Sequence, residues 1–330
     1  MTMMRDHYIF SNGRLKRKNN TIYFEKETGE KIPLPIEKIR TLHLFGEIDV
    51  NSALLRYLSQ YGIFLQFYNY YGFYVGTYVP REQKESGYII VKQSEYYLDP
   101  YKRLYLAYQF LQGAVHHMQR NLRRHKEHTL EIMAEIEAIS QQFQNATDIQ
   151  SLMGKEGQIR KIYYEAFNYM VKQDFVIEKR EKQPPRDPLN ALISFGNSLM
   201  YQVILSEIYR TPLNPTISYL HEPSTKRFSL SLDLAEIFKP LIVDSVILNL
   251  INKRRITDKH FDKLEGEICY LNEEGKKRFI QAWEEKLQQT VKHRKLNRNT
   301  SYRFLIRLEC YKLIKHLLND EIYKPLKAWW

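Results

Sequence analysis

The sequence predicts an α+β protein in which a strand-rich N-terminal domain precedes a larger all-α domain. Three observations predict this class. The first eighty residues alternate short apolar runs with turn signals, the chain beyond residue 96 carries apolar residues at helical spacing, and a length of 330 residues indicates about two domains. We therefore expect a β domain over residues 1–80, a linker over 81–95 and a helical domain over 96–330.

Strands are expected in the first domain wherever β-branched and aromatic residues cluster between turn signals. These segments are 7–11, 15–18, 21–24, 41–45, 63–68 and 73–78, and the last two form a predicted hairpin. Asn12-Gly13 and Asn19-Asn20 mark turns. Asn51 predicts the N-cap of a short helix that runs to Gln60, because an Asn side chain accepts hydrogen bonds from the free N–H groups of a first turn.

The linker is expected where the chain becomes polar, between Pro80 and Gly87. Beyond it, Asp99 and Pro100 predict a helix start, because Asp is a good cap and Pro suits the first helical turn. Further helices are expected from about 129 to 143, after Gly157 and over 189–209. The remainder of the chain is predicted to be helix after helix.

The charge balance favours an anionic partner. Fifty Lys and Arg residues against 38 Asp and Glu residues give a formal net charge of +12, which favours binding to phosphate backbones. Only Cys269 and Cys310 are present, too few for a disulfide framework or a thiolate zinc cage. No window is apolar over the roughly 18 residues of a membrane span, and the opening residues lack the apolar core of a signal peptide. We therefore expect a soluble, cytoplasmic protein.

Common nucleotide and hydrolase signatures are absent from the sequence. There is no phosphate-cradling Gly-rich loop, no dinucleotide fingerprint and no Gly-x-Ser-x-Gly elbow. Neither cysteine has an activating base nearby in sequence, so a thiol nucleophile is not favoured.

Glu165 is the first candidate for chemistry. The helix expected after Gly157 carries an apolar stripe of Ile159, Ile162, Tyr163, Ala166 and Met170. At about 100° per residue, Glu165 lies roughly 130° from the centre of this stripe and is not a core residue. A lone helical Glu is usually a solvated surface carboxylate, but the aromatic residues on both sides of Glu165 indicate a partly covered groove.

A second group of candidates consists of His221, Asp233 and Glu236. Pro223 favours an extended backbone before it, so His221 is expected to end a structured stretch and face a loop. Asp233 and Glu236 share a helical face, although Asp-x-x-Glu also caps helix starts. Pro240 cannot donate to the carbonyl of Glu236, which predicts a kink at that turn. Two carboxylates and one imidazole can hold a divalent ion and leave positions for water or a phosphate oxygen.

Four motifs follow one another along the chain. They are Gly154-Lys155-Glu156-Gly157 with Tyr164-Glu165-Ala166-Phe167, the segment 187–197, Leu220-His221-Glu222, and the segment 233–244. In this order and at these separations they resemble the CRISPR-associated endonuclease/integrase of spacer acquisition, the family often called Cas-one. The N-terminal strands, with segments 44–46 and 72–76, also resemble the β domain of that family.

The resemblance implies a helical catalytic domain that binds Mg²⁺ or Mn²⁺ through a Glu, a His and an acidic residue. The matching positions are Glu165, His221 and Glu236, and Asp233 matches a supporting acidic position. Such an ion would polarise a target phosphate for in-line attack by a 3′-hydroxyl or by water, without a covalent protein intermediate.

Basic residues are expected to contact the DNA backbone more than the bases. The candidates are Arg123, Arg124, Lys226, Arg227, Lys239 and Arg294. Each of them alone is more often a solvated surface charge. Lys239 stands where relatives commonly have Arg, and Pro212 and Ser218 stand where Gly is frequent, but these departures leave the three presumed ligands in place.

The resemblance also implies partners. They are double-stranded DNA (the spacer precursor and the CRISPR repeat), a second copy of the chain that pairs through the β domain, and a smaller adaptation protein. Two alternatives remain open: a stand-alone metal-dependent nuclease that acts on branched DNA in repair, and a scaffold without turnover in which Asp233 and Glu236 merely cap a helix. Metal-dependent strand transfer separates the scaffold from both enzymes, and repeat-specific joining separates the two enzymes.

Overall fold

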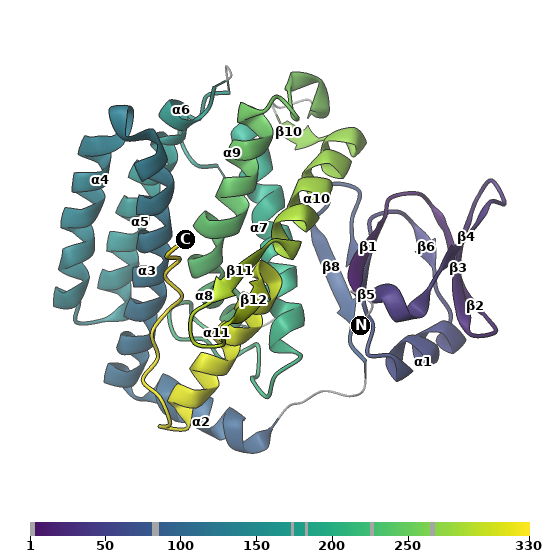
Figure 1. The fold of residues 1–330 in the computed structure, drawn as a ribbon, viewed down its shortest axis with the longest axis horizontal. Coiled ribbons are helices and arrows are strands. Elements are labelled where there is room, and N and C mark those ends of the chain that lie inside the picture. Colours follow the sequence, from purple (N-terminus) through teal and green to yellow (C-terminus); the bar gives the residue numbers. More distant parts are fainter. Residues whose placement is uncertain (1–3, 81–85, 173–174, 182–183, 225–227, 265–267) are drawn as a thin grey trace. The chain divides into compact units, whose positions relative to one another are not determined.

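The computed structural model describes residues 4–80, 86–172, 175–181, 184–224, 228–264 and 268–330 (Figure 1). The chain forms two compact units, Met1–Gln83 and Lys84–Trp330. The boundary between them lies close to the expected one. However, helix α2 (Gly87–Leu98) begins inside the segment 81–95 that we predicted to be a linker, so most of that segment is helical. Residues 81–85 lie outside the described part.

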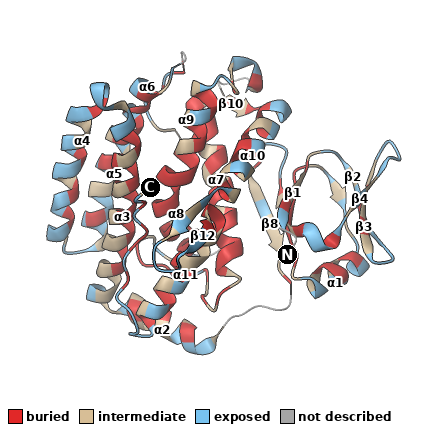
Figure 2. Cartoon of the chain, in the orientation of Figure 1, coloured by how far each residue is buried: buried red, intermediate tan, exposed pale blue. Residues whose placement is uncertain are grey.

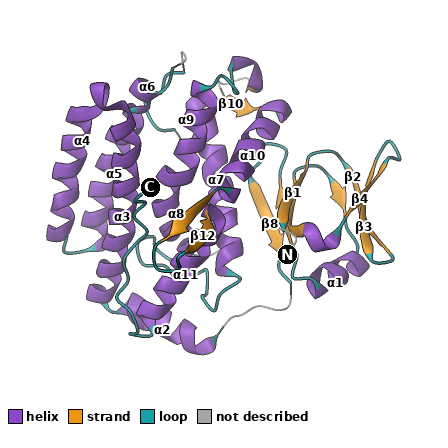
Figure 3. Cartoon of the chain, in the orientation of Figure 1, coloured by secondary structure: helices purple, strands orange, loops and turns teal. Residues whose placement is uncertain are grey.

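Two four-stranded sheets build the first unit (Figure 3). Their strand orders are β1-β5-β7-β8 and β4-β3-β2-β6. The strands are β1 (Arg5–Ile9), β2 (Gly13–Lys18), β3 (Thr21–Lys26), β4 (Lys31–Leu34), β5 (Ile39–Leu44), β6 (Ile48–Asp49), β7 (Phe64–Tyr68) and β8 (Tyr74–Tyr78). Strands β1, β5 and β7 are parallel and β8 pairs antiparallel to β7, as the predicted hairpin requires. In the second sheet β2–β3 and β3–β4 are antiparallel and β2–β6 is parallel.

Helix α1 (Ser52–Gln60) closes the core of the first unit. The Asn51 side chain accepts a hydrogen bond from the Leu54 N–H at 2.9 Å, which confirms the predicted cap. Gly62 has φ +63°, a left-handed conformation that glycine adopts without strain, so the helix ends just before it. Leu54 and Leu58 are fully buried in one apolar cluster with residues of both sheets, including Leu15, Ile22, Leu42 and Leu65.

The second unit is mainly helical. Its α-helices after α2 are α3 (Pro100–Leu122), α4 (Lys126–Gln141), α5 (Ile149–Glu165), α6 (Phe167–Met170), α7 (Pro188–Ile208), α8 (Ser229–Phe238), α9 (Ser245–Asn252), α10 (Glu273–Gln288) and α11 (Tyr302–Leu317). Two short antiparallel hairpins also occur, β9 (Phe261–Leu264) with β10 (Ile268–Leu271) and β11 (Thr290–His293) with β12 (Arg298–Ser301). The prediction of a purely helical second domain missed them because four-residue strands are too short to show a clear alternation.

Helix α5 begins earlier than predicted. We expected it to start after Gly157, but Asp148 caps it by accepting a hydrogen bond from the Ser151 N–H at 2.7 Å. Gly154 and Gly157 therefore lie inside the helix, where each glycine costs about 1 kcal/mol relative to alanine. Residues 149–165 therefore form one continuous helix, and the relative positions of their side chains follow from helical geometry.

The centre of the second unit is helix α8, which is buried along nearly its whole length (Figure 2). It packs against α3 and α7. After it, residues Lys239–Asp244 form a π-helical segment instead of continuing as α-helix. Pro240 has no N–H to donate to Glu236, which explains the wider turn and agrees with the predicted irregularity. Among the described residues, no helix is both long and apolar enough to cross a membrane.

Candidate functional site

The loop that carries His221 is held by Asp233 on α8. The Asp233 carboxylate accepts hydrogen bonds from the backbone N–H groups of Tyr219 at 2.6 Å, Leu220 at 3.0 Å and His221 at 2.9 Å. It also pairs with Nδ1 of the His221 ring at 2.8 Å. Since the carboxylate can only accept, Nδ1 must carry the proton and Nε2 is left as the basic nitrogen. Asp233 therefore holds both the loop and the ring of His221, and it does not cap its own helix, which begins four residues earlier.

A second contact holds the outer side of the same loop. Arg103 on α3 donates from Nε to the carbonyl of Tyr219 at 2.9 Å and from Nη2 to Glu222 at 2.6 Å. The Tyr97 hydroxyl donates to the other oxygen of Glu222 at 2.9 Å. Tyr219 and Glu222, on either side of His221, are therefore held by side chains of α2 and α3.

Glu236 lies on α8 one turn after Asp233 and is only 4% exposed. Its carboxylate accepts hydrogen bonds from Nη2 of Arg160 and, at 2.7 Å, from Nζ of Lys239. Burial by itself would raise the pKa of Glu236, but the positive charges of Arg160 and Lys239, together with the nearby His221 ring, outweigh burial and lower the pKa to about 2. Glu236 is therefore ionised at neutral pH, and His221 is close enough to act on it electrostatically.

Asp244, at the end of the π-helical segment, is a further buried carboxyl beside this site. It accepts a hydrogen bond from the Tyr163 hydroxyl at 3.0 Å, and that hydroxyl in turn accepts from Asn121 at 2.9 Å. Burial raises the pKa of Asp244 to about 7, although Arg160, Tyr163 and Lys239 act in the opposite direction. This hydrogen-bonded chain connects α3, α5 and the π-helical segment beneath the site.

Arg160 brings a further carboxylate, that of Glu156, to the cluster. The Nε of Arg160 donates to Glu156 Oε1 at 2.8 Å while Nη2 of the same guanidinium donates to Glu236. Glu156 precedes Arg160 by four residues, so both side chains lie on one face of α5. Two carboxylates from different helices thus meet at one cation.

Glu165 is not part of this cluster. It is the last residue of α5, nine residues after Glu156, which places it about half a turn around the helix and about 13 Å further along its axis. Its side chain is exposed and forms no hydrogen bond or ion pair within the described residues. The aromatic rings of Tyr163, Tyr164 and Phe167 are buried core side chains and do not wall a groove around it.

The sequence contained a signal for Glu156 that we did not use. Glu156 lies inside the family-like motif Gly154-Lys155-Glu156-Gly157, but we expected the helix to begin after that motif. With α5 starting at Ile149, Glu156 and Arg160 form an i,i+4 pair on one helix face. An early helix start at Asp148 would have placed Glu156 in the helix.

The side chains of Glu156, His221 and Glu236 do not surround a position in which an ion could bind. Among the described residues, no three acidic, histidine or cysteine side chains are gathered closely enough to hold a metal. The Arg160 guanidinium lies between the two carboxylates instead. As donors, two carboxylates and the Nε2 of a properly oriented imidazole nevertheless suit Mg²⁺ or Mn²⁺.

The predicted DNA-contacting residues have different environments. Arg123 and Arg124 are exposed at the end of α3, and Arg294 is exposed with its guanidinium 4.7 Å from the ring centre of Trp329. Lys239, in contrast, is only 8% exposed and is committed to Glu236, so the prediction of a direct backbone contact there does not fit its burial. Lys226 and Arg227 lie outside the described residues.

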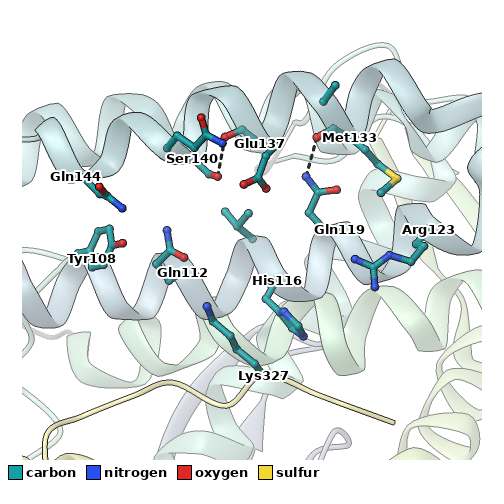
Figure 4. A pocket seen from close by; sticks show the side chains of 13 residues that line it. Tyr108, Gln112, His116, Gln119, Arg123, Met133, Glu137, Ser140, Gln144 and Lys327 are labelled. Atoms are coloured by element: carbon teal, nitrogen blue, oxygen red, sulfur yellow. Dashed lines mark hydrogen bonds between the residues drawn. The ribbon is translucent and has the colours of Figure 1, made fainter.

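A cavity of about 480 Å³ lies between α3, α4 and the C-terminal segment (Figure 4). Its lining includes Gln112, His116, Arg123, Glu137 and Lys327. None of the carboxylates of the α5–α8 cluster contributes to it. The cavity is therefore separate from the candidate site.

Known proteins are similar to this chain in sequence and in fold. The profile of the family described as "CRISPR associated protein Cas1" matches residues 7–285. A protein of Clostridium perfringens named "CRISPR-associated endonuclease Cas1" is 60% identical over 99% of this chain and all of its own length. One from Thermodesulfovibrio yellowstonii, "CRISPR-associated endonuclease Cas1 3", is 56% identical over 99% of this chain and 100% of its own.

Solved structures agree with these relatives. A Cas1 protein from Thermotoga maritima superimposes with a TM-score of 0.88 at 41% identity, covering 97% of this chain and 99% of that one. A casposase bound to an integration product has a TM-score of 0.87 at 19% identity, covering 99% of this chain and 94% of that one, which is a likeness of fold. The motifs, the α+β architecture and the matched relatives together show that this chain belongs to the Cas1 family of CRISPR-associated proteins.

Proposed function

We propose that this protein is a metal-dependent DNA endonuclease and integrase that inserts short foreign DNA fragments into a CRISPR array by 3′-OH transesterification. The single observation that carries the proposal is the convergence of Glu156 and Glu236 on one cation next to an imidazole oriented by Asp233. Membership of the Cas1 family, whose relatives at 56–60% identity are named endonucleases, supports it.

The residues we propose as metal ligands are Glu156, His221 and Glu236, with Glu156 replacing the Glu165 of the initial hypothesis. A bound Mg²⁺ or Mn²⁺ would supply a Lewis acid that polarises the target phosphate and favours ionisation of the attacking hydroxyl. The ligand set is ready for this role because Glu236 is ionised at neutral pH and His221 carries its proton on Nδ1. Asp233 supports the imidazole from behind, as outer carboxylates commonly do for metal-binding histidines.

A matched pair of variants on one helix tests the ligand set. We expect E156Q to lower Mn²⁺-dependent joining of a DNA 3′ end by about a hundredfold or more, since loss of a ligand costs at least as much as loss of an outer partner. E165Q removes the same charge from the exposed end of α5 and is expected to join DNA at nearly the wild-type rate. Rates would be measured with a labelled fragment and a repeat-containing plasmid.

The opposite result, full activity in E156Q and loss in E165Q, would restore the initial hypothesis and refute ours. Joining that continues at the wild-type rate in both E156Q and H221A would refute a metal-dependent mechanism at this site altogether. A circular dichroism spectrum of each variant, compared with wild type, shows whether lost activity reflects lost folding.

The same measurements also distinguish the two alternative functions. A repair nuclease would cut branched DNA in a metal-dependent reaction but would show no preference for a CRISPR repeat. A scaffold would bind DNA without turnover. The buried position of Glu236, with Glu156 beside it, favours an enzyme because a scaffold has no need for a buried carboxylate that shares the Arg160 cation with a second carboxylate.

The proposal includes the partners implied by the family. These are double-stranded DNA, a second copy of the chain joined through the β domain, and a smaller adaptation protein that sets the fragment length. Arg123, Arg124 and Arg294 remain the proposed backbone contacts, because they are exposed cations in the described part of the chain. A cytoplasmic location belongs to the same proposal.

A further inference from the structure

Arg160 fills the space between the two carboxylates that we propose as metal ligands. It donates from Nε to Glu156 and from Nη2 to Glu236, and its side chain is 12% exposed. Its third nitrogen, Nη1, is buried and has no hydrogen-bond partner among the described residues. One guanidinium therefore bridges two helices, and both N–H groups of its Nη1 are without a partner among the described residues.

Glu156 and Glu236 are already paired with cations without a metal ion. Glu156 and Glu236 supply two negative charges, while Arg160 and Lys239 supply two positive ones. A divalent ion placed between the carboxylates would meet two cations at short range in a partly buried site, where repulsion is poorly screened. At least one of the cations has to give way.

Arg160, and not Lys239, occupies the position that the ion would take. Lys239 lies three residues from Glu236 on the same helical turn and contacts a single carboxylate oxygen at 2.7 Å. Its ammonium also lies 4.9 Å from the ring centre of Tyr201, which is a second stabilising contact. Arg160, in contrast, contacts both carboxylates and so occupies the position between them.

We propose that Arg160 is a built-in counter-cation of the metal site, which holds Glu156 and Glu236 in the metal-free protein and competes with the divalent ion for them. This inference rests on the proposed function, because it assumes that these carboxylates bind the ion. It assigns to Arg160 a positioning role that sets metal affinity, apart from any contact with DNA.

Metal binding in the absence of DNA tests the inference. Free Mn²⁺ would be titrated with the full-length protein and followed by its electron paramagnetic resonance signal. We expect R160Q to bind Mn²⁺ roughly tenfold more tightly than wild type, a size typical of coupling between two competing ligands. R160K keeps the charge but cannot bridge two carboxylates with a fork, so its affinity should fall between the two.

The matched control is K161Q. Lys161 is the next residue of α5 and is exposed, so its loss removes one positive charge without touching the carboxylates and should leave Mn²⁺ affinity unchanged. Thermal unfolding gives a second readout. Without metal, R160Q should melt below wild type because Glu156 and Glu236 then repel each other, and saturating Mn²⁺ should raise its melting temperature more than that of wild type.

An affinity of R160Q equal to or weaker than that of wild type would overturn the inference. An increase of the Mn²⁺ affinity in K161Q as large as that in R160Q would also overturn it, because the loss of one positive charge would then explain the result by itself. If R160Q does not fold, R160K decides by the same criterion. Mn²⁺ binding that survives unchanged in E156Q and H221A would refute the proposed ligand set as well, whereas loss in those variants with no change in R160Q would refute the role of Arg160 alone.

Discussion

Two histidines contact helix α8, and they differ in what their ring nitrogens meet. His221 pairs through Nδ1 with Asp233, and its other ring nitrogen makes no hydrogen bond among the described residues. His117 on α3 uses both nitrogens: Nδ1 donates to the carbonyl of Ile237 at 2.8 Å, and Nε2 accepts from the N–H of Ala328 at 3.1 Å. A histidine with one nitrogen left over can bind a ligand, while one with both nitrogens bonded to backbone is part of the architecture.

The burial of the two rings follows the same division. His117 is 1% exposed, and burial lowers its pKa to about 3, so it stays neutral at physiological pH. It ties the C-terminal segment to the residue that follows Glu236. Pro325 of that segment also packs where a Cβ on Gly113 would lie, 2.9 Å from the proline Cβ, so α3 and the segment approach closely. The contrast therefore separates the side of α8 that carries our proposed metal ligands from the side that is bound to the C-terminal segment.

Among the variants that test this contrast, the largest expected effect concerns the support of His221. D233N replaces a carboxylate that accepts four hydrogen bonds by an amide whose NH₂ group faces donors. We expect strand joining to fall by about 10- to 100-fold, the usual cost of an outer-shell change at a metal site. The control is S231A on the same helix, because the Ser231 hydroxyl donates only to the carbonyl of Phe228. If D233N joined DNA as fast as S231A, Asp233 would have no part in the site.

An effect of intermediate size is expected on the pH dependence of the unfolding free energy, and it comes from His117. The pKa of a histidine is near 6.5 in the unfolded chain and about 3 for His117 in the folded one, so between these values the unfolded state binds more protons. His117 therefore stabilises the protein fully above pH 6.5, and this contribution falls as the pH decreases towards 3. We expect H117Q to flatten the dependence of the unfolding free energy on pH in this window by up to about 1.4 kcal/mol per pH unit.

Urea denaturation at several pH values measures this slope. H128Q is the matched control, because His128 lies on the exposed surface of α4 and its loss should not change the slope. A slope in H117Q that equals the wild-type slope would show that His117 is not held neutral in the folded protein, and the contrast with His221 would lose its basis.

The smallest effect is expected at the outer side of the His221 loop. The ion pair of Arg103 and Glu222 joins a half-buried guanidinium to a carboxylate whose side chain is 64% exposed. Exposed pairs of this kind contribute about 0–1 kcal/mol, so E222Q should lower the unfolding free energy by at most about 1 kcal/mol. Strand joining should change less than twofold, about the limit of the assay. A loss as large as that of D233N would mean that the outer contact positions His221 as much as Asp233 does.

Local sequence signals predicted much of the fold. The caps at Asn51 and Asp99 mark helix starts that the structure confirms, because a cap acts through neighbours two or three residues away. The start of α5 was missed, since Gly154 and Gly157 are helix-breaking in isolation and only packing of the helix makes them tolerable. The short hairpins β9–β10 and β11–β12 were missed because their pairing depends on neighbouring elements.

The candidate site was predicted only in part. His221, Asp233 and Glu236 were singled out from their motifs, and the structure brings them together around α8. Glu165 was expected from its match to a family motif and from its angle to the apolar stripe. The angle identifies a residue outside the core, but it does not say what lies opposite that residue. Lys239 was expected on the DNA surface, yet it is buried beside Glu236.

The sequence by itself determined the α+β class, the family, the basic character and the residue types of the site, because these depend on composition, on short-range spacing and on motifs. Only the tertiary structure decided which glutamate of α5 faces Glu236 and which histidine keeps a free nitrogen. The physical reason is that both questions concern partners more than seventy residues away, and nothing in a local pattern records which face of one helix will meet another.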